Sequence, residues 1–392
     1  MATTLLSRTL TILLLAVLTW TAVPAAQPAR AASLSPVASF GANPGNLTMY
    51  AYRPDGLGSG RPLVVLLHGC TQNADGYFAA SGWRKYADQW GFALVLAQTG
   101  SANNSASCFN WFQTGDTTRG QGEAASIRNM VAHAVSAYGS DPARVYVSGL
   151  SAGGAMAAVM LATYPDVFAA GSIGAGLAYR CATSLVQASS CQYGPTSRTP
   201  QQWGDLVRGA HPGHAGPYPR VAIWQGQSDY TVVPANGKQL RDQWTNVRGV
   251  SQTPSATRSL TGGTTLTVYG DDDVRLYEIA GMGHGLPVDP GSGADQCGAT
   301  AAYFLDTICS AYHDARFFAL DGDAPPTPTP TVPGTCVRAS NYAHTTAGRA
   351  YQSSGYTYAN GSNEPMGLWN THIVHSLRQT GPDHWVLADG EC

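Results

Sequence analysis

The sequence predicts an α/β fold, with a doubly wound, mostly parallel sheet that carries helices on both faces, followed by a small C-terminal module. Three observations predict it. Short, continuous apolar runs recur over residues 62–280, as in strands that are buried on both faces. Helical segments separate several of these runs, which favours parallel strands joined by crossover helices. A proline-rich stretch then separates a short final segment from the rest of the chain.

The elements follow from the local patterns in chain order. The apolar runs that we assign to strands are Pro62–Leu67, Phe92–Ala97, Arg144–Val147, Val167–Ile173, Arg220–Trp224 and Arg275–Ala280. The segments that we assign to helices are Ala79–Trp90, Gly122–Tyr138 and Ala152–Thr163. Ligands of such sheets bind beyond the carboxyl ends of the strands, so we expect the chemistry directly after these runs.

Composition divides the chain into four parts. Residues 1–31 combine Arg8, a short apolar core and a small-x-small cleavage signature, which is typical of a signal peptide. The alternative is an uncleaved anchor, but the apolar core is short for a membrane span. Residues 32–320 form one large α/β domain, and 321–335 form an extended Pro/Thr-rich linker. Residues 336–392 form a module with a small hydrophobic core, and we expect a disulfide to stabilise it.

The balance of charge limits the partners that we expect. The net charge is −2, and losing Arg8 and Arg30 with a signal peptide would take it to about −4. A value so close to neutrality argues against nucleic acid or anionic lipid as the main partner. No later stretch is long and apolar enough for a membrane helix. We therefore expect a secreted, extracellular monomer that acts on neutral substrates.

Eight cysteines behind an export signal indicate disulfides. The pairings that we expect are local: Cys70–Cys108, Cys181–Cys191, Cys297–Cys309 and Cys336–Cys392. Neither a C-x-x-C pair nor a His/Cys cluster has the spacing of a zinc site, so we expect no metal.

The best candidate for a nucleophile is Ser151, in the G-x-S-x-G motif Gly149–Gly153. In a chain with 45 glycines the motif alone is weak, because it also arises by chance. Here a predicted strand precedes it and small residues begin a predicted helix after it. This is the context of a nucleophile elbow, in which a strained turn exposes the serine at the helix N-terminus. The alternative is a glycine-rich turn without function. The elbow makes the predicted sheet one of the α/β-hydrolase type.

A serine hydroxyl needs a base, and in this fold its partners follow in the order Ser, acid, His. Asp229 lies on the loop after the strand Arg220–Trp224, whereas the other candidate acids, Asp205 and Asp242, follow no strand. His284 lies between glycines after the strand Arg275–Ala280, where its imidazole can reach the serine. The remaining candidates, His133, His211, His214 and His313, lie in weaker contexts. The alternatives are that Asp229 is a solvated or helix-capping aspartate and that His284 is a structural histidine.

Acyl transfer also needs donors for the oxyanion. One should be the backbone N–H of Ala152, and the other should come from the loop His68–Gln72, where we select the N–H of Cys70. We expect the His68 side chain to be a structural wall. Near Cys108, we expect Phe109, Trp111 and Phe112 to line an acyl or alcohol pocket, and core packing is the alternative.

Four ordered motifs give the chain a resemblance to a known family: His68–Gln72, Gly149–Gly153, Trp224–Asp229 and Gly281–His284. They resemble the extracellular poly(3-hydroxybutyrate) depolymerases, the short-chain-length polyhydroxyalkanoate depolymerases, which are related to feruloyl and acetylxylan esterases. The resemblance covers residues of about 45–320. It implies Ser151, Asp229 and His284 as a catalytic triad and Cys70 as an oxyanion donor.

The final segment resembles the substrate-binding module of the same depolymerases, which adsorbs the enzyme to solid polyester. The resemblance rests on Cys336–His344, Gly348–Ala350, Tyr358–Ser362 and Met366–Leu368. The linker is short beside those of many relatives. The segment is rich in aromatic residues, whose flat amphipathic rings suit a neutral, partly apolar surface. These are Tyr342, Tyr351, Tyr356, Tyr358, Trp369 and Trp385, and we expect half of them to form the small core and others, among them Tyr342 and Trp369, to bind substrate.

Together these patterns predict a secreted serine esterase that hydrolyses poly(3-hydroxybutyrate)-type polyesters through an acyl-enzyme and needs no cofactor. A feruloyl or acetylxylan esterase that acts on plant cell-wall polysaccharide esters is the alternative substrate class. A polymer-adhesion protein with an inactive hydrolase body is the non-enzymatic alternative.

Overall fold

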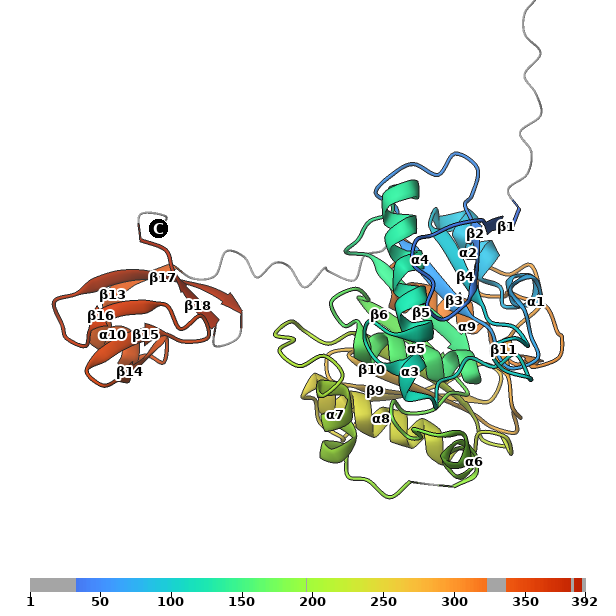
Figure 1. Cartoon of the computed structure of the whole chain (residues 1–392). Coiled ribbons are helices and arrows are strands. Elements are labelled where there is room, and N and C mark those ends of the chain that lie inside the picture. Colours follow the sequence, from blue (N-terminus) through green and yellow to red (C-terminus); the bar gives the residue numbers. More distant parts are fainter. Residues whose placement is uncertain (1–32, 195, 323–335, 382–383, 390–392) are drawn as a thin grey trace, which may run out of the picture.

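The computed structural model describes residues 33–194, 196–322, 336–381 and 384–389 (Figure 1). The expected signal peptide and most of the expected linker lie outside the described residues, as does Cys392 of the fourth expected disulfide. The division of the chain into domains therefore stays a prediction. No helix in the described ranges has both the length and the apolar character that crossing a membrane requires.

A ten-stranded sheet forms the centre of the body, in the order β1-β2-β4-β3-β5-β6-β7-β10-β9-β8. Its strands are β1 Ser35–Val37, β2 Thr48–Tyr52, β3 Leu63–Leu67, β4 Ala93–Gln98, β5 Val145–Leu150, β6 Ala170–Gly174, β7 Arg220–Gly226, β8 Ala256–Leu260, β9 Thr264–Tyr269 and β10 Val274–Ile279. The strands from β4 to β10 in this order pair in parallel, which confirms the predicted sheet. Antiparallel strands, which the apolar runs do not predict, extend it at both edges.

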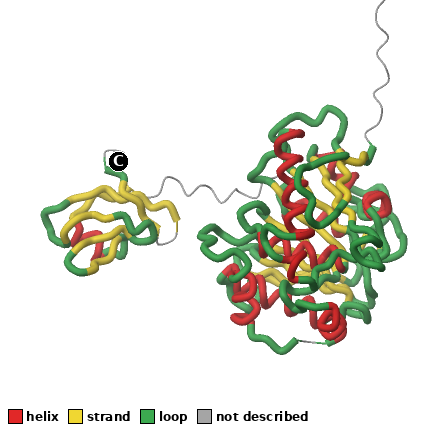
Figure 2. Tube along the Cα trace, in the orientation of Figure 1, coloured by secondary structure: helices red, strands yellow, loops and turns green. Residues whose placement is uncertain are grey.

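Helices cover both faces of the sheet (Figure 2). They are α1 Ala74–Ala80, α2 Trp83–Trp90, α3 Thr114–Thr117, α4 Gly122–Tyr138, α5 Ala152–Thr163, α6 Leu185–Tyr193, α7 Pro200–Arg208, α8 Ala235–Arg248 and α9 Ser310–Phe317. Buried side chains of α4, α5, α7 and α8 share one core with alternate residues of β3 such as Val65. Those of α1, α2 and α9 share a second core with the intervening residues such as Leu66. The alternation explains why the central strands are apolar on both faces.

Two predicted helices have the bounds that we expected, α4 and α5. The third prediction, one helix over Ala79–Trp90, is wrong at its start, because α1 ends at Ala80 and α2 begins at Trp83. Gly82 separates them with a left-handed φ of 83°. A Cβ there would overlap the side chain of Cys297, so the break depends on a distant residue that local pattern does not reveal.

Three disulfides join the expected partners: Cys70–Cys108, Cys181–Cys191 and Cys297–Cys309. The last of them lies beside a small parallel pair of strands, β11 Leu286–Val288 and β12 Phe304–Asp306. Each bond therefore ties a loop of the body to a neighbouring segment of the same region.

The C-terminal part contains two three-stranded sheets, β13-β17-β18 and β14-β15-β16, and one short helix. Its elements are β13 Cys336–Ser340, α10 Asn341–Thr346, β14 Ala350–Ser353, β15 Tyr356–Ala359, β16 Pro365–Leu368, β17 Val374–Gly381 and β18 His384–Leu387. The core is small, with Ala350, Ala359, Met366, Leu377 and Trp385. The expectation that half of the six aromatic residues form this core is wrong, because only Trp385 among them is buried.

Candidate active site

The turn between β5 and α5 holds Ser151 in a strained conformation, with φ 57° and ψ −118°. The neighbouring glycines permit this turn. A Cβ on Gly149 would overlap the backbone of Gly153, and a Cβ on Gly153 would overlap the backbone of Leu67. The Ser151 N–H donates to Gly174 O on β6 at 2.8 Å, which anchors the turn to the sheet. The strand–turn–helix context predicted from the motif is therefore present in the fold.

Ser151, His284 and Asp229 form one hydrogen-bonded line. His284 Nε2 lies 2.9 Å from Ser151 Oγ, and His284 Nδ1 lies 2.8 Å from Asp229 Oδ2. The neutral tautomer that satisfies both contacts carries its proton on Nδ1, which leaves Nε2 to accept the serine proton. The loops after β5, β7 and β10 supply the three side chains, and these strands end at the same edge because they are parallel.

Asp229 is held firmly beneath the imidazole. Its Oδ1 accepts the N–H groups of Thr231 and Val232, each at 2.8 Å, so that Oδ2 is directed at His284. The Asp229 side chain has no exposed surface, whereas 11% of the His284 side chain is exposed. The carboxylate of Asp229 is therefore buried, whereas solvent reaches both His284 and the half-buried Ser151.

The backbone amides of Cys70 and Ala152 are the two candidates for binding an oxyanion. A Cβ built on Gly69 would lie 3.5 Å from Ser151 Cβ, so the loop that carries Cys70 passes close to the serine. In the described part of the chain, neither the Cys70 N–H nor the Ala152 N–H donates a hydrogen bond to another backbone or side-chain group. Free N–H groups beside a nucleophile can stabilise negative charge that develops on a carbonyl oxygen.

Gln72 fixes this loop, a role that the sequence analysis missed although it noted the motif. Its side-chain Oε1 accepts the Gly69 N–H at 2.7 Å, and its Nε2 donates to Ala302 O at 3.4 Å. Thr71, with a φ of 62°, donates its N–H to Ala106 O at 2.7 Å. The Cys70–Cys108 disulfide adds a covalent tie to the same neighbouring loop.

His68 lies behind the site as the wall that we expected. Its Nδ1 is 2.7 Å from Gly69 O, and its Nε2 accepts the Thr99 N–H at 3.3 Å. Burial lowers the pKa of His68, which favours the neutral ring that these two contacts need. Phe109 packs against it, with ring centroids 5.0 Å apart.

The aromatic loop is more deeply buried than a pocket wall would be. Phe109 has no exposed surface, and Trp111 and Phe112 are only 6% and 5% exposed. All three belong to the core on the α4 and α5 face, which is the alternative that the sequence left open. The placement of Phe109 leaves it no surface to offer a substrate.

Glu123, at the start of α4, is a buried acid beneath this loop that sequence reasoning did not single out. Its Oε2 accepts the Asn110 N–H at 2.7 Å, and its Oε1 lies 3.4 Å from Thr99 Oγ1. Burial and the nearby Asp116 raise the pKa of Glu123 to about 8. An acid in the first helical turn is common, so no signal in the sequence distinguished this one.

The other titratable candidates lie outside this line. Asp205 and Asp242 pair with arginines of their own helices, Arg208 and Arg241. Among the other histidines named from the sequence, His313 packs against Trp224, Tyr277 and Tyr312. Over the described residues, no group of three His, Cys, Asp or Glu side chains is arranged to hold a metal ion.

Comparison with known proteins gives a consistent result. The family model described as Esterase PHB depolymerase matches residues 47–267, which include Ser151 and Asp229 and end before His284. The poly(3-hydroxyalkanoate) depolymerase C of Paucimonas lemoignei is 50% identical over 295 residues, which cover 74% of this chain and 71% of that protein. An acetylxylan esterase of Coprinopsis cinerea is 40% identical over 271 residues, 67% of this chain and 72% of that protein.

Solved structures agree with the sequence matches. The structure of an acetyl xylan esterase from Aspergillus awamori superposes with a TM-score of 0.64 at 29% identity. The match covers 74% of this chain and 99% of that chain. The body is therefore an α/β-hydrolase fold.

Proposed function

This chain belongs to the esterase PHB depolymerase family, and on that premise we propose that it hydrolyses the ester bonds of poly(3-hydroxybutyrate)-type polyesters. It is a carboxylic ester hydrolase by family. The single observation that supports the reaction type is the position of His284 between Ser151 Oγ and Asp229 Oδ2, at 2.9 and 2.8 Å. The match to the Paucimonas lemoignei depolymerase supports the substrate class.

The first half of the reaction forms an acyl-enzyme. His284 Nε2 takes the proton of Ser151 as Oγ attacks the ester carbonyl, and Asp229 holds the ring in the required tautomer. Negative charge develops on the carbonyl oxygen, where the N–H groups of Cys70 and Ala152 stabilise it. When the C–O bond breaks, His284 returns its proton to the departing alkoxide, which leaves as the hydroxyl end of a polymer fragment.

The second half repeats the steps with water. His284 takes a proton from a water molecule, whose oxygen attacks the acyl carbon of the ester formed with Ser151. The intermediate then collapses, and the proton passes to Ser151 Oγ, so the enzyme is regenerated and the fragment leaves with a carboxylate. The reaction needs no group beyond the chain and water.

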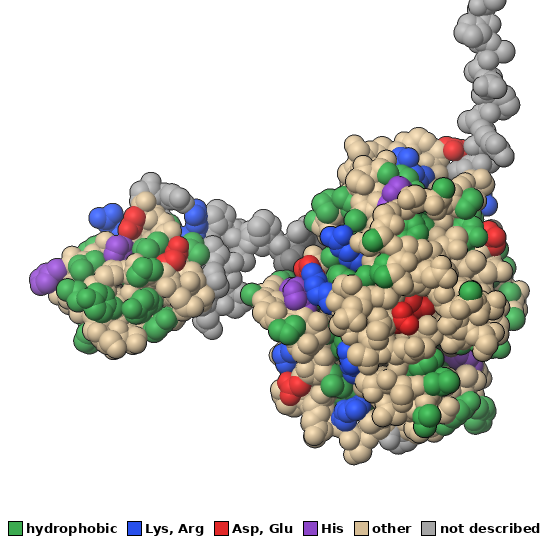
Figure 3. Space-filling model, in the orientation of Figure 1, with side chains coloured by type: hydrophobic (Ala, Val, Ile, Leu, Met, Phe, Trp, Pro, Cys, Tyr) green, Lys and Arg blue, Asp and Glu red, His purple; other side chains and the backbone are tan. Residues whose placement is uncertain are grey.

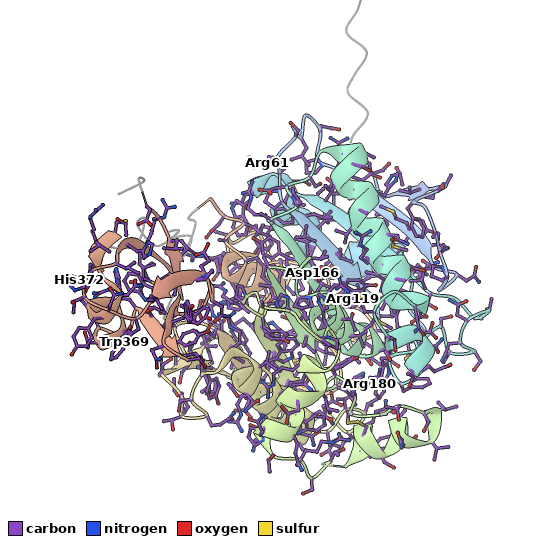
Figure 4. All side chains as sticks on the ribbon, turned by 60° about the vertical axis from the view of Figure 1, so that its left-hand side comes forward. Arg61, Arg119, Asp166, Arg180, Trp369 and His372 are labelled. Carbon is purple, nitrogen blue, oxygen red and sulfur yellow. A yellow bond between two sulfur atoms is a disulfide. The ribbon has the colours of Figure 1, made fainter. Side chains whose placement is uncertain are left out.

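We also propose that the C-terminal part binds the polymer. Tyr342 and Trp369 lie side by side, with ring centroids 5.5 Å apart, and they are 44% and 43% exposed. Trp369 and His372 are directed outward from this part of the chain (Figure 4). Paired exposed rings offer an amphipathic surface, which suits a neutral solid. Secretion, on which contact with such a solid depends, is part of the same proposal.

An ester of a plant polysaccharide is the second candidate substrate. The 40% identity with an acetylxylan esterase and the superposition on an acetyl xylan esterase favour it. The same three residues would cleave an acetyl or feruloyl ester by the same steps. The difference between the two candidates therefore lies in what the surface around Ser151 accepts.

The decisive experiment compares substrates for one enzyme preparation. The purified full chain should clear a poly(3-hydroxybutyrate) suspension and erode a film, and Ser151→Ala should do neither. Release of acetate or ferulate from xylan or bran, with an intact film, would replace the polyester by the polysaccharide ester. Absence of labelling of Ser151 by a fluorophosphonate probe would instead indicate an adhesion protein.

A further inference from the structure

Five large hydrophobic side chains stand exposed on the described body, and all five lie on segments near the catalytic edge of the sheet. They are Leu185, Val186, Tyr193, Tyr230 and Tyr303, which are 68%, 85%, 61%, 83% and 44% exposed. Exposed large hydrophobic side chains are ordinary when they are scattered singly over a surface. Their restriction to one edge of the sheet is the feature that needs an explanation.

Contacts or chain adjacency connect the three segments that carry these side chains to the triad. Tyr230 directly follows Asp229 in the chain, and the Tyr303 ring centroid lies 5.9 Å from that of His284. The other three belong to α6. The C-terminal turn of α6 is bonded to the loop of Asp229, since Gln192 O accepts the Val233 N–H at 3.0 Å and Asn236 Nδ2 at 3.2 Å. The three segments that carry the five side chains are therefore joined to the site, and we call these five side chains the rim.

The stretches of chain that carry the site hold little charge, although the exposed Asp295 and Asp306 flank the stretch of Tyr303. The stretches that carry the triad, the two amides and the five rim side chains are 68–73, 99–115, 149–163, 181–197, 227–234, 280–288 and 297–305. They contain no Lys, Arg, Asp or Glu except Asp229, which is buried. Arg180 and Arg198, which flank α6 in the chain, are half-buried, and the guanidinium of Arg198 lies over the Trp203 ring.

The opposite edge of the sheet differs in this respect. The turns that enter the parallel strands carry ionised side chains, among them Arg61 before β3, Asp141 and Arg144 before β5, and Asp166 before β6. Figure 4 labels Arg61 and Asp166, and Asp166 pairs with Arg119 at 2.7 Å. The view in Figure 3 shows hydrophobic side chains gathered at the lower right of the body, where Figure 1 places α6, with acidic and basic side chains elsewhere on that face. Charge is therefore sparser within the stretches that carry the site than in these turns.

We propose that this rim, formed by Leu185, Val186, Tyr193, Tyr230 and Tyr303 around Ser151, is a docking face by which the catalytic body itself seats on the surface of solid polyester. The inference rests on the proposed function and deepens it, because it assigns polymer contact to the body as well as to the C-terminal part. Contact with a solid removes water from the face, which is favourable for apolar side chains and costly for ionised ones. A rim of apolar side chains with few charges beside it suits both conditions.

The rim also explains how a polymer chain at the surface of the solid reaches Ser151. His284 and Ser151 are partly exposed, whereas Asp229 is covered. A face that seats flat around the exposed pair brings the surface ester groups to the serine and excludes bulk water from the reacting carbonyl. A hydrated, hydroxyl-rich polysaccharide gains little from such a face, so the rim favours the polyester over the second candidate substrate.

The test uses the full chain and a ratio of two rates, that on polyester film divided by that on a soluble p-nitrophenyl ester. Leu185→Ser/Val186→Ser should lower this ratio by about tenfold, because two apolar side chains no longer contribute to seating. Val186→Lys should lower it as well. The matched control is Ala169→Lys, which adds the same charge at an exposed position before β6, on the opposite edge. It should keep the wild-type ratio.

Two further measurements separate the possible outcomes. The same substitutions are made with Tyr342→Ser/Trp369→Ser, so that adhesion by the C-terminal part does not conceal the effect, and thermal unfolding verifies the fold of each variant. If the wild type erodes film and every rim variant keeps its ratio, the docking face is wrong and the proposed function stands. If the wild type cleaves the soluble ester but no film, the proposed function fails first. Concentration-dependent dimerisation that Val186→Lys abolishes, with an unchanged film ratio, would make the rim a contact between copies of the chain.

Discussion

Gln72 Oε1 accepts the Gly69 N–H at 2.7 Å, and this bond fixes the turn that carries Cys70 close to Ser151. The loop has no regular hydrogen-bond ladder of its own, so the side chain of Gln72 replaces one. Its other end reaches Ala302 O, on the loop that also carries Tyr303. A polar side chain that touches no reacting atom thus connects the loop of the proposed oxyanion donor with the loop of Tyr303.

We predict that Gln72→Met lowers kcat on a soluble ester by about tenfold with little change in KM, because a loosened amide stabilises the transition state less well. Gln72→Glu keeps an acceptor for the Gly69 N–H and should recover part of the rate. Steady-state kinetics on both variants measure the effect. A Gln72→Met enzyme with the wild-type kcat would show that the turn needs no such support.

Asp229→Asn should lower kcat by about 10³ to 10⁴-fold at neutral pH. The asparagine oxygen can still accept the Thr231 and Val232 N–H groups, but its NH₂ then faces His284 Nδ1 and favours the tautomer that cannot accept the serine proton. Asp205→Asn and Asp242→Asn are the matched controls, since each pairs with an arginine of its own helix. If a control loses activity while Asp229→Asn retains it, the substituted aspartate of that control, and not Asp229, is the acid of the triad.

The positions of Ser151, Asp229 and His284 could be predicted because each follows a strand of a parallel sheet, and such strands end at one edge. The pattern of apolar runs identifies the strands, and the glycines identify the turn. The order of the three residues along the chain then leaves few alternatives. The meeting of residues far apart in sequence thus follows from topology, without knowledge of any side-chain contact.

Other features depend on contacts that local pattern does not encode. The break at Gly82 depends on Cys297, and the antiparallel strand β8 lacks a continuous apolar run because its residues are half-buried or exposed. Trp111 lies in an aromatic loop that suits either a pocket or a core, and only the fold decides between them. The burial of Glu123 was equally hidden, because an acid in a first helical turn is normally solvated.

Removing the Cys70–Cys108 disulfide should affect both stability and rate. The bond closes a separation of 38 residues, for which restriction of the unfolded chain is worth about 4 kcal/mol. Cys70→Ala/Cys108→Ala should therefore lower the free energy of unfolding and also lower kcat, because the Cys70 amide is freed to move. Cys297→Ala/Cys309→Ala, with a separation of 12 residues, should lower stability by about 3 kcal/mol and leave kcat near the wild-type value. Equal kcat in the two double variants would contradict the proposed link to the oxyanion.

Glu123 makes stability depend on pH in a direction that can be derived from its burial. Its pKa rises from 4.5 to about 8 in the folded chain, so between these values the folded chain holds a proton that the unfolded chain has released. Stability therefore falls as pH rises through this window.

Glu123→Gln keeps an acceptor for the Asn110 N–H and a donor for Thr99, but it does not titrate. The melting temperature of this variant relative to the wild type should therefore rise by about 3 °C or more between about pH 5 and pH 8. Asp314, whose pKa burial raises to about 7, acts in the same direction, so part of the slope remains until Asp314→Asn is added. A constant difference in melting temperature over this range would mean that Glu123 stays ionised in the folded chain, and that the hydrogen bonds from Asn110 and Thr99 suffice to hold a buried charge.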